Sequence, residues 1–566
     1  MKRIISIILG MSMVLALAGC SKKEETTKKK SKKTKVTTEE SETEDSETDP
    51  TDTEETDPTT SETSDTSDTT DTTPSDTSTP AVPGASTIEH TLEDLGFYNL
   101  PTDRAYAVAY TDGSITTMTG VSEYFDDYYF DLTGYDALEN ALDGIYGGVA
   151  VDNDDAYDEA REKFIEDMKD GQYHLTVSRE CRTLLFRADS AVTSFLLTTT
   201  TSDDEPFAPA AYNLRSENGE TIGFNDVITD REAFCDFVDS YLVKAPEVNK
   251  LLSDEISDIL TNIRTGKDID FTLGFDGIFL FIEQDLYFKV PVHMLADCVN
   301  MEFFNNTPEY YTLVSDATNV IEWDVDDDNV PDKLKLEVTY DEYDAFETMT
   351  LWFNNESAKV PDDVLSELPG GVDDFYYMHA STGDFVIVNF YDEFGPGYYC
   401  FKIDGQQVSY SCAKDGHFGG FPYNPECFTF CVWTDVFGTS DFYGDFYLDA
   451  TGQALLDESF VYRSFYGVNN TAVTKVDVEA VKVDISASGD QLEDVETFTL
   501  PAGTVLQYVF LDPYESRIVF STIEENEEDE ILLKLPLDYE DLPEETVIKI
   551  GGMAQTELFD GLRFAG

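Results

Sequence analysis

Residues 21–88 contain almost no apolar side chains, and this feature sets where folding of the chain can begin. Ser, Thr, Asp, Glu and Lys dominate the segment, with scattered Pro. Such a segment cannot bury enough apolar surface to offset the entropy lost on folding, so we expect it to be disordered. Its eight lysines lie near its start, and most of its 18 acidic residues follow them. The segment is therefore predicted to be an extended tether, with the folded part beginning near residue 89.

Residues 1–20, which precede the tether, carry the signature of export. A positively charged start is followed by an apolar stretch that is too short to span a bilayer, for which about 20 apolar residues are needed. The sequence LAGC at residues 17–20 resembles the bacterial lipobox. The resemblance implies a diacylglyceryl lipid on the sulfur of Cys20 and removal of the signal peptide just before it. An ordinary signal peptide with an incidental cysteine is the alternative.

Lipidation would place the chain on the extracytoplasmic face of a cell membrane, with the tether's lysines against anionic lipid headgroups. The formal net charge of the whole chain is -79, and most of it lies after residue 88. Nucleic acid is therefore not an expected partner, because phosphate contacts need a basic surface. Cationic partners and divalent metal ions are favoured instead.

The region 89–312 mixes helical and strand periodicities. Alternating residues from 102 to 120 around Asp112-Gly113 predict a hairpin. Helical spacing predicts helices at 135–147, 155–170, 230–243 and 248–263. Strands are predicted at 173–177, 183–187, 191–198, 271–273, 278–282 and 286–292. The pattern is typical of an α+β domain with helices on an antiparallel sheet.

Several motifs of this region follow one another in the order of a known extracytoplasmic family. They are Arg187-Ala188-Asp189-Ser190, Ser194-Phe195, Tyr212-Asn213-Leu214, Asn218-Gly219-Glu220, Phe224-Asn225-Asp226-Val227, Phe271-Thr272-Leu273, Asp276 to Phe281, and Val290-Pro291-Val292. This series resembles the domain of unknown function that the lysozyme-sensing anti-sigma factor RsiV shares with the peptidoglycan deacetylase PdaC. The resemblance implies binding of lysozyme, a very basic protein.

The same motif residues have a second interpretation. Asn218-Gly219 and Asp276-Gly277 fit hairpin turns, and Asp226 fits a turn cap, so these residues can specify the fold rather than a site. The sequence also departs from both relatives, because we find neither a sigma-binding segment with a transmembrane helix nor the metal-binding motifs of a deacetylase. We therefore expect neither an anti-sigma factor nor a deacetylase.

The region 313–566 is predicted to be all-β, with a possible internal boundary near 471. Strand patterns follow one another between turns such as Asp404-Gly405 and Thr451-Gly452, and sandwich, barrel and partial propeller remain open. Residues 500–506 (LPAGTVL) faintly resemble an SH3-like bacterial wall-binding strand.

An acidic loop opens this second region and is its sharpest feature. Asp324, Asp326, Asp328 and Asp332 fall at positions 1, 3, 5 and 9, and position 7 offers the carbonyl of Val330. This spacing wraps oxygen ligands around a hard cation, and we predict a structural Ca²⁺ site. A lysine occupies position 12, so the loop is not an EF-hand. A solvated acidic turn is the alternative.

The remaining side chains give no catalytic constellation. The GxSxG, HExxH, Walker and dinucleotide-binding patterns are absent from the sequence. The seven cysteines after Cys20 are odd in number and form no CxxC pair, which predicts thiols rather than a disulfide framework. The five histidines are far apart in the chain and are expected to lack partners at ligand spacing. They are His90, His174, His293, His379 and His417.

These observations predict a non-enzymatic, surface-anchored lipoprotein of a Gram-positive bacterium. Its expected ligand is a cell-wall polymer or a cationic protein such as lysozyme. A cell-wall or glycan-active enzyme is the second possibility. With so many acidic residues, the sequence does not single out the two carboxylates that a hydrolase of this kind would use. A solute-binding lipoprotein is the third.

Overall fold

The computed structural model describes residues 89–564 apart from short internal segments. These segments are 113–114, 202–209, 244–252, 268, 282–286, 317, 327, 329, 367, 393–394, 458–461, 465–469, 486–491, 513–514, 524–530 and 542–545. The described residues belong to one compact unit. The predicted signal peptide, Cys20 and the tether 21–88 lie outside them. Within the described part, no helix has the length and apolar character needed to cross a membrane.

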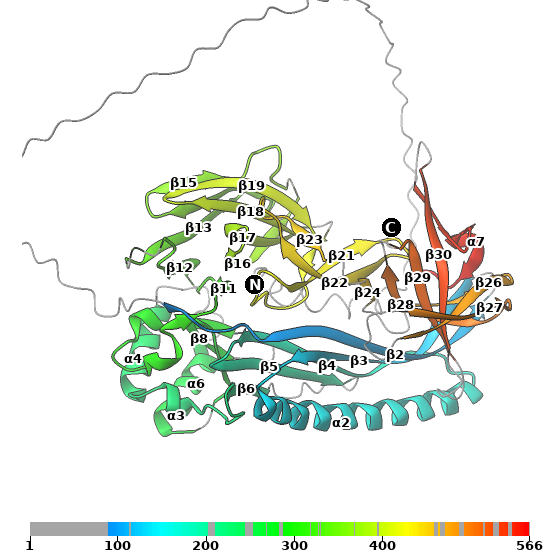
Figure 1. Cartoon of the computed structure of the whole chain (residues 1–566), viewed down its shortest axis with the longest axis horizontal. Helices are drawn as coiled ribbons and strands as arrows, with labels where there is room; N and C mark the ends of the chain where they lie inside the picture. Colours follow the sequence, from blue (N-terminus) through cyan, green and yellow to red (C-terminus); the bar gives the residue numbers. More distant parts are fainter. Residues whose placement is uncertain are drawn as a thin grey trace, which may run out of the picture. The chain divides into compact units, whose positions relative to one another are not determined.

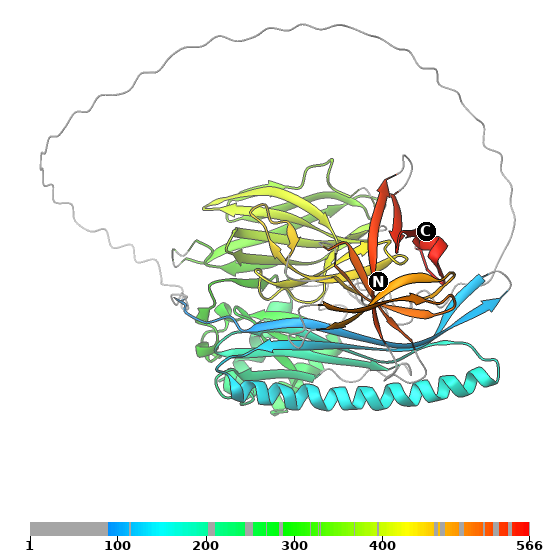
Figure 2. The same ribbon diagram turned by 45° about the vertical axis from the view of Figure 1, so that its right-hand side comes forward.

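A five-stranded sheet and one long helix begin the fold (Figures 1 and 2). The strands in spatial order are β2 (Gly96–Asp112), β3 (Ile115–Asp131), β4 (Leu175–Ala188), β5 (Val192–Thr201) and β6 (Ala210–Arg215). Neighbours pair antiparallel except β3 and β4, which run parallel. A parallel pair needs a long crossover, and helix α2 (Asp136–Lys169) supplies it. The predicted hairpin is confirmed, with 17 residues in each strand.

Helix α2 is continuous, so the prediction of two helices in this segment was wrong. Gly147 and Gly148, at which the first helix was expected to end, lie inside it. The buried residues Tyr146, Asn153 and Tyr157 continue one face of the helix across this point. That face packs on the sheet, and its packing outweighs the low helix propensity of two glycines.

Three further helices and a small sheet complete the first region. The helices are α3 (Phe224–Val227), α4 (Arg231–Leu242) and α6 (Ser253–Thr265). The sheet contains β7 (Phe271–Leu273), β8 (Gly277–Phe281) and β9 (Tyr287–Pro291). Asp230 caps α4 by accepting the backbone N–H groups of Glu232 and Ala233. These elements share one apolar core, as the sequence periodicity predicted.

Short elements join this region to the next. They are β1 (Glu89–His90), which pairs parallel with β10 (Asn306–Thr307), and the 3₁₀ helices η2 (Val292–Met294) and η3 (Met301–Phe303).

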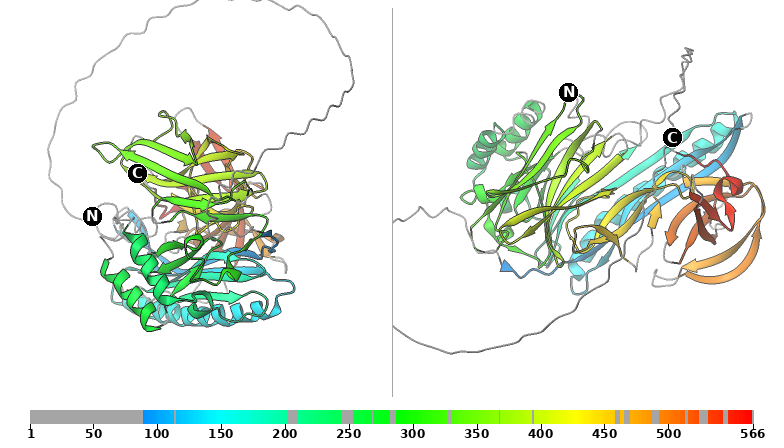
Figure 3. Two further views of the ribbon diagram at one scale, coloured as in Figure 1. Left: turned by 90° about the vertical axis from the view of Figure 1, so that its left-hand side faces the viewer. Right: turned by 90° about the horizontal axis from the view of Figure 1, so that it is seen from above.

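Two sheets pack face to face around one core at the start of the second region (Figure 3). The first contains β11 (Tyr311–Val314), β16 (Gly370–Ala380), β17 (Gly383–Asp392), β18 (Gly395–Asp404) and β19 (Gln407–Asp415). The second contains β12 (Val320–Trp323), β13 (Asp332–Tyr340), β14 (Phe346–Phe353) and β15 (Glu356–Lys359). Of the architectures left open, this part is therefore a sandwich. The predicted boundary at 312/313 falls inside β11.

The last sheet has 14 strands among the described residues. They are β20 (His417–Phe418), β21 (Phe428–Thr434), β22 (Ser440–Leu448), β23 (Ala454–Leu456), β24 (Tyr462–Ser464), β25 (Thr471–Thr474), β26 (Val478–Ile485), β27 (Leu492–Leu500), β28 (Val505–Asp512), β29 (Arg517–Thr522), β30 (Leu532–Asp541), β31 (Thr546–Ile550), β32 (Met553–Ala554) and β33 (Phe559–Asp560). A short helix, α7 (Gln555–Leu558), precedes β33. Because β24 pairs with β22 and with β28, strands on both sides of residue 471 share this sheet.

An apolar cluster joins the two regions. It combines Phe186 and Leu196 of the first sheet with Met378 of the sandwich and Phe430 of the last sheet. The predicted fold class is confirmed: an α+β part is followed by a part that is mostly β-strand.

Candidate functional site

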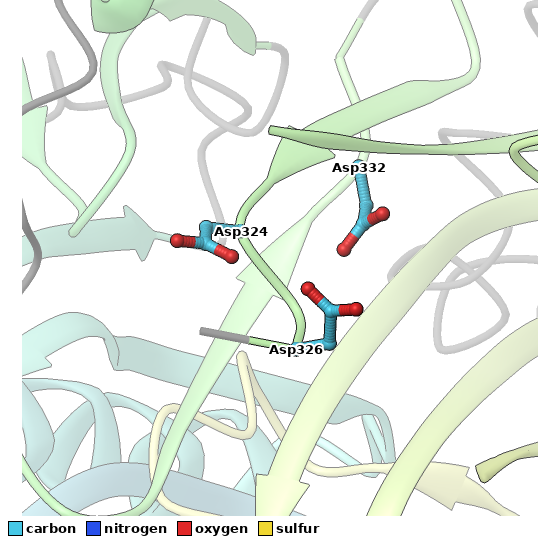
Figure 4. A group of neighbouring side chains, drawn as sticks. All are labelled: Asp324, Asp326 and Asp332. Carbon is cyan, nitrogen blue, oxygen red and sulfur yellow. The ribbon is translucent and has the colours of Figure 1, made fainter. Parts of the chain in front are cut away.

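The loop between β12 and β13 brings three of the predicted calcium ligands together (Figure 4). Asp324, Asp326 and Asp332 each offer a carboxylate oxygen, and these three atoms lie within 4.8 Å of one another. Trp323 and Asp332 are directly opposite in the antiparallel pair β12–β13, so the sheet fixes the base of the loop. The group therefore has one rigid member, Asp332, which is only 6% exposed.

Neutral donors from neighbouring turns hold two of these carboxylates in place. Asp332 accepts hydrogen bonds from the Val325 backbone N–H at 3.1 Å and from the Asn354 side-chain amide at 2.5 Å. Asp326 accepts one from the side-chain amide of Gln406. These amides orient the oxygens and add no positive charge. A group of three carboxylates at this spacing is the hard oxygen donor set that Ca²⁺ prefers.

One of the predicted carboxylate ligands, Asp328, lies outside this group of three. The backbone N–H of Asp328 donates to Asp324 at 3.0 Å, and the carboxylate of Asp328 accepts the backbone N–H of Val330 at 2.8 Å. The side chain of Asp328 thus orders the loop itself. Val330 is 61% exposed. Sequence spacing alone could not separate the carboxylate that shapes the turn from those that converge.

The second candidate site is the outer face of α2, which we call the acidic face. The helix carries eleven acidic residues against three basic ones. Ten of the eleven are exposed: Asp136, Glu139, Asp143, Asp152, Asp154, Asp155, Asp158, Glu159, Glu162 and Glu166. The opposite face packs on the sheet, and the exposed carboxylates fall in two groups, at 136–143 and at 152–166, along a helix about 50 Å long. The helix contributes a strongly negative surface with few compensating charges, and residues 144–151 between its two acidic groups carry no charge.

The motif residues of the first region form buried structural contacts. The Ser194 hydroxyl donates to the Asn213 side chain at 2.6 Å and accepts the Leu273 backbone N–H at 2.8 Å. Asn213 in turn donates to the carbonyl of Phe271 at 2.7 Å. Gly219 has φ +68° in its turn, and the Asp226 carboxylate accepts the Gly223 backbone N–H at 2.8 Å. These contacts tie β5 and β6 to β7, which supports the interpretation that the motifs specify the fold.

A group of carboxylates near the start of the first region was missed by the sequence analysis. Asp94 forms an isolated antiparallel bridge with Asp189. Burial is the largest cause that raises the pKa of Asp94 to about 7, and the negative charges of Asp189, Glu426 and Glu309 contribute to the same rise. No signal in the sequence could have found this group, because its members are separated by up to 332 positions along the chain.

Although the histidines are far apart in the chain, several of them lie beside another histidine or a carboxylate in the structure. The rings of His90 and His379 stack with 6.1 Å between their centroids. Nδ1 of His379 lies 2.6 Å from Asp384, and Nε2 of His293 lies 3.0 Å from Glu322. Strand β11 pairs with β16 at His379, and β1 lies beside β10, which brings positions distant in sequence together.

One small cavity lies between the first and last sheets in the described part. Its volume is about 30 Å³, and Thr183, Leu185, Phe421, Phe428 and Asp445 are among its lining residues. A cavity of this volume has room for one or two water molecules.

Comparisons with known proteins found partial similarity to solved structures only. No family model matches the chain, and no curated protein matches it. A DUF3298 family member from Bacteroides fragilis has 13% sequence identity and a TM-score of 0.23, and the alignment covers 36% of this chain and 94% of that one. A DUF3298 family protein from Pseudomonas aeruginosa has 12% identity and a TM-score of 0.23, with 38% of this chain and 97% of that one covered. Both of these structures are described as DUF3298 family proteins, and each aligns with little more than a third of this chain.

Proposed function

We propose that this protein is a non-enzymatic lipoprotein that binds a cationic protein, such as lysozyme, at the surface of a Gram-positive cell. In this proposal a diacylglyceryl lipid on Cys20 holds the chain on the extracytoplasmic face of the membrane. Residues 21–88 then separate the folded part from the lipid. The acidic face of α2 is the single observation that carries the choice of partner.

The charge of this face favours a basic protein over a neutral one. Ten exposed carboxylates on one helix create a negative potential that attracts a cationic partner and speeds its encounter with the surface. The helix is fixed to the sheet along its apolar side, so its backbone loses little conformational freedom when a partner binds. The motif resemblance to the domain shared by RsiV and PdaC agrees with lysozyme as the partner. A cell-wall polymer is the other candidate ligand in this proposal.

Calcium has a structural role in the proposal. Asp324, Asp326 and Asp332 are the residues that would hold the ion, with Asp332 as the rigid ligand at the base of the loop. A bound ion would offset the repulsion among three carboxylates and fix the loop that opens the sandwich. It would not contact the acidic face.

A glycan-active enzyme remains the second candidate because of the carboxylates around Asp94. A carboxyl group with a pKa near 7 is suited to general-acid work on a glycosidic bond. Release of reducing sugars from peptidoglycan by the protein, and loss of that release in Asp94→Asn, would favour the enzyme over the binding protein.

The test of the proposed function is calorimetric titration of the soluble protein with lysozyme. The titration is run at low and at moderate salt, each with Ca²⁺ and with a chelator. Saturable binding that weakens with salt but persists at moderate salt is the expected result, because electrostatic steering is screened while a docked interface is only weakened. Heat that disappears at moderate salt, or no binding, would contradict the proposal.

A further inference from the structure

Two cysteines lie directly opposite each other on neighbouring strands. Cys400 of β18 pairs with Cys412 of β19, and the register shifts just beyond them, between Cys400 and Phe401. Residues opposite each other in an antiparallel pair have Cα atoms about 4.5–5.5 Å apart and side chains on the same face of the sheet. This separation lies within the range that a disulfide bond spans.

Both thiols also point toward one acceptor on a third segment. The sulfur of Cys400 lies 3.9 Å from the carbonyl oxygen of Thr451, and the sulfur of Cys412 lies 3.4 Å from the same atom. Thr451 belongs to the turn between β22 and β23. Beside it, a Cβ on Gly452 would come within 2.2 Å of the Cys400 sulfur, so this turn covers Cys400 closely. The two sulfurs therefore lie side by side beneath the turn that contains Thr451.

The two thiols differ in reactivity. Cys400 is fully buried, and burial raises its pKa well above the ordinary range of a thiol. Cys412 is half-buried, and the hydrogen bond from the Cys400 thiol lowers its pKa, with the charge of Lys414 acting in the same direction. Cys412 is thus the thiol that can ionise and be reached from solvent, and Cys400 is the shielded thiol behind it.

We propose that Cys400 and Cys412 form a redox-active pair that is oxidised to a cross-strand disulfide by exchange with a small disulfide compound. The Cys412 thiolate attacks one sulfur of the compound, forms a mixed disulfide and releases one thiolate. The Cys400 thiol then loses its proton and attacks the Cys412 sulfur, which expels the second thiolate. The protein loses two protons and two electrons, and the small disulfide is reduced to two thiols.

The remaining described cysteines provide controls within the same chain. Cys427 is half-buried like Cys412, but burial raises its pKa to about 12, with Asp445 and Asp457 acting in the same direction. It should stay a thiol when Cys412 reacts. Cys181, Cys235, Cys298 and Cys431 are buried.

The test is to incubate the reduced full chain, carrying Cys20→Ser, with oxidised glutathione under native conditions and to map its cysteines by mass spectrometry. The expected product is a peptide pair linked between Cys400 and Cys412, with two hydrogens lost and no glutathione retained. In Cys400→Ser, Cys412 should keep one glutathionyl group, because no second thiol resolves the mixed disulfide. Cys412→Ser should gain neither glutathione nor a link at Cys400, and Cys427→Ser should behave like the parent chain.

Two outcomes would overturn the proposal. One is a parent chain in which both thiols survive treatment. The other is a parent chain in which Cys412 keeps glutathione and no link to Cys400 forms. Both outcomes are measured on the parent chain, so they do not depend on the folding of any variant.

Discussion

Arg187 and Asp189 form a fully buried ion pair, with 2.5 Å between Nε of the arginine and Oδ2 of the aspartate. The same guanidinium donates to the carbonyl of Phe303 at 2.5 Å, and the other carboxylate oxygen accepts the backbone N–H of Val192 at 3.0 Å. The pair therefore fastens the end of β4 to the start of β5 and to the segment near η3. Both residues belong to the first motif of the family resemblance.

Removing one member of this pair should destabilise the fold strongly. Asp189→Ala leaves a buried arginine without its counter-charge, and we expect the free energy of unfolding to fall by about 3–5 kcal/mol. Urea denaturation followed by fluorescence measures this change. The control is Asp362→Ala, which breaks the exposed pair with Lys359 and should cost less than about 1 kcal/mol. Equal losses in the two variants would show that the buried pair does not anchor the first region.

The stability of the protein should carry a pH-dependent contribution from Asp94. Its pKa is 3.8 in an ordinary environment and about 7 in the folded chain, so the folded state holds a proton that the unfolded state has lost. This contribution is fully present below about pH 4 and is lost as the pH rises through about 7. Asp94→Asn cannot ionise. Its unfolding free energy relative to the parent should therefore increase from pH 4.5 to pH 8, by a few kcal/mol at most.

Comparing variant with parent cancels the other titrating groups, such as Asp374, whose pKa burial raises to about 6. The control is Asp538→Asn on the exposed part of β30. If the difference in unfolding free energy between Asp94→Asn and the parent stays constant from pH 4.5 to pH 8, the pKa of Asp94 is not raised in the folded chain.

Calcium should raise the melting temperature of the protein through the three converging carboxylates. Asp324→Asn or Asp326→Asn should remove most of this increase, because each takes one charged ligand from the group of three. Asp328→Asn is the matched control. It lies in the same loop, and an asparagine oxygen can still accept the N–H of Val330. If all three variants lose the calcium effect equally, the ion is held by the loop as a whole; if the parent shows none, the calcium proposal fails.

Anchoring should depend on one sulfur. Cys20→Ala removes the atom to which the diacylglyceryl group would be joined, so the protein should move from the membrane fraction to the soluble fraction. Immunoblotting of fractionated cells measures this distribution, and Cys427→Ala, far from the anchor, is the control. A membrane-bound Cys20→Ala protein would show that attachment does not use this cysteine.

Local sequence signals predicted elements where one segment decides its own structure. The residues beside Asp112 formed the expected hairpin, and Asp230 caps the helix that was expected to begin beside it. The break expected after Gly147 did not occur, because the helix propensity of one segment competes with packing of a long face against another. Helix continuity here depends on the sheet, which the segment alone does not reveal.

In the candidate sites, too, local spacing was predictable from the sequence and contacts between distant segments were not. Three of the four acidic ligands predicted in the β12–β13 loop converge, since their spacing is local. The neighbourhood of Asp94 with Glu426, and the pairing of Cys400 with Cys412 under Thr451, depend on strand order and register. Neither property can be read from spacing along the chain.

Neutralising part of the acidic face of α2 shows whether that face binds a cationic protein. Asp155, Asp158 and Glu162 are exposed and spaced three and four residues apart, so they form one stripe of the helix. The variant Asp155→Asn/Asp158→Asn/Glu162→Gln should weaken calorimetric binding of lysozyme at least tenfold.

The matched control is Glu493→Gln/Glu496→Gln/Asp538→Asn, which removes the same charge from exposed positions of β27 and β30. It should leave the affinity within about twofold of the parent, because charges beyond the Debye length of about 8 Å are screened at physiological salt. Equal weakening in the two variants would mean that lysozyme responds only to net charge. That result would contradict a binding site on α2.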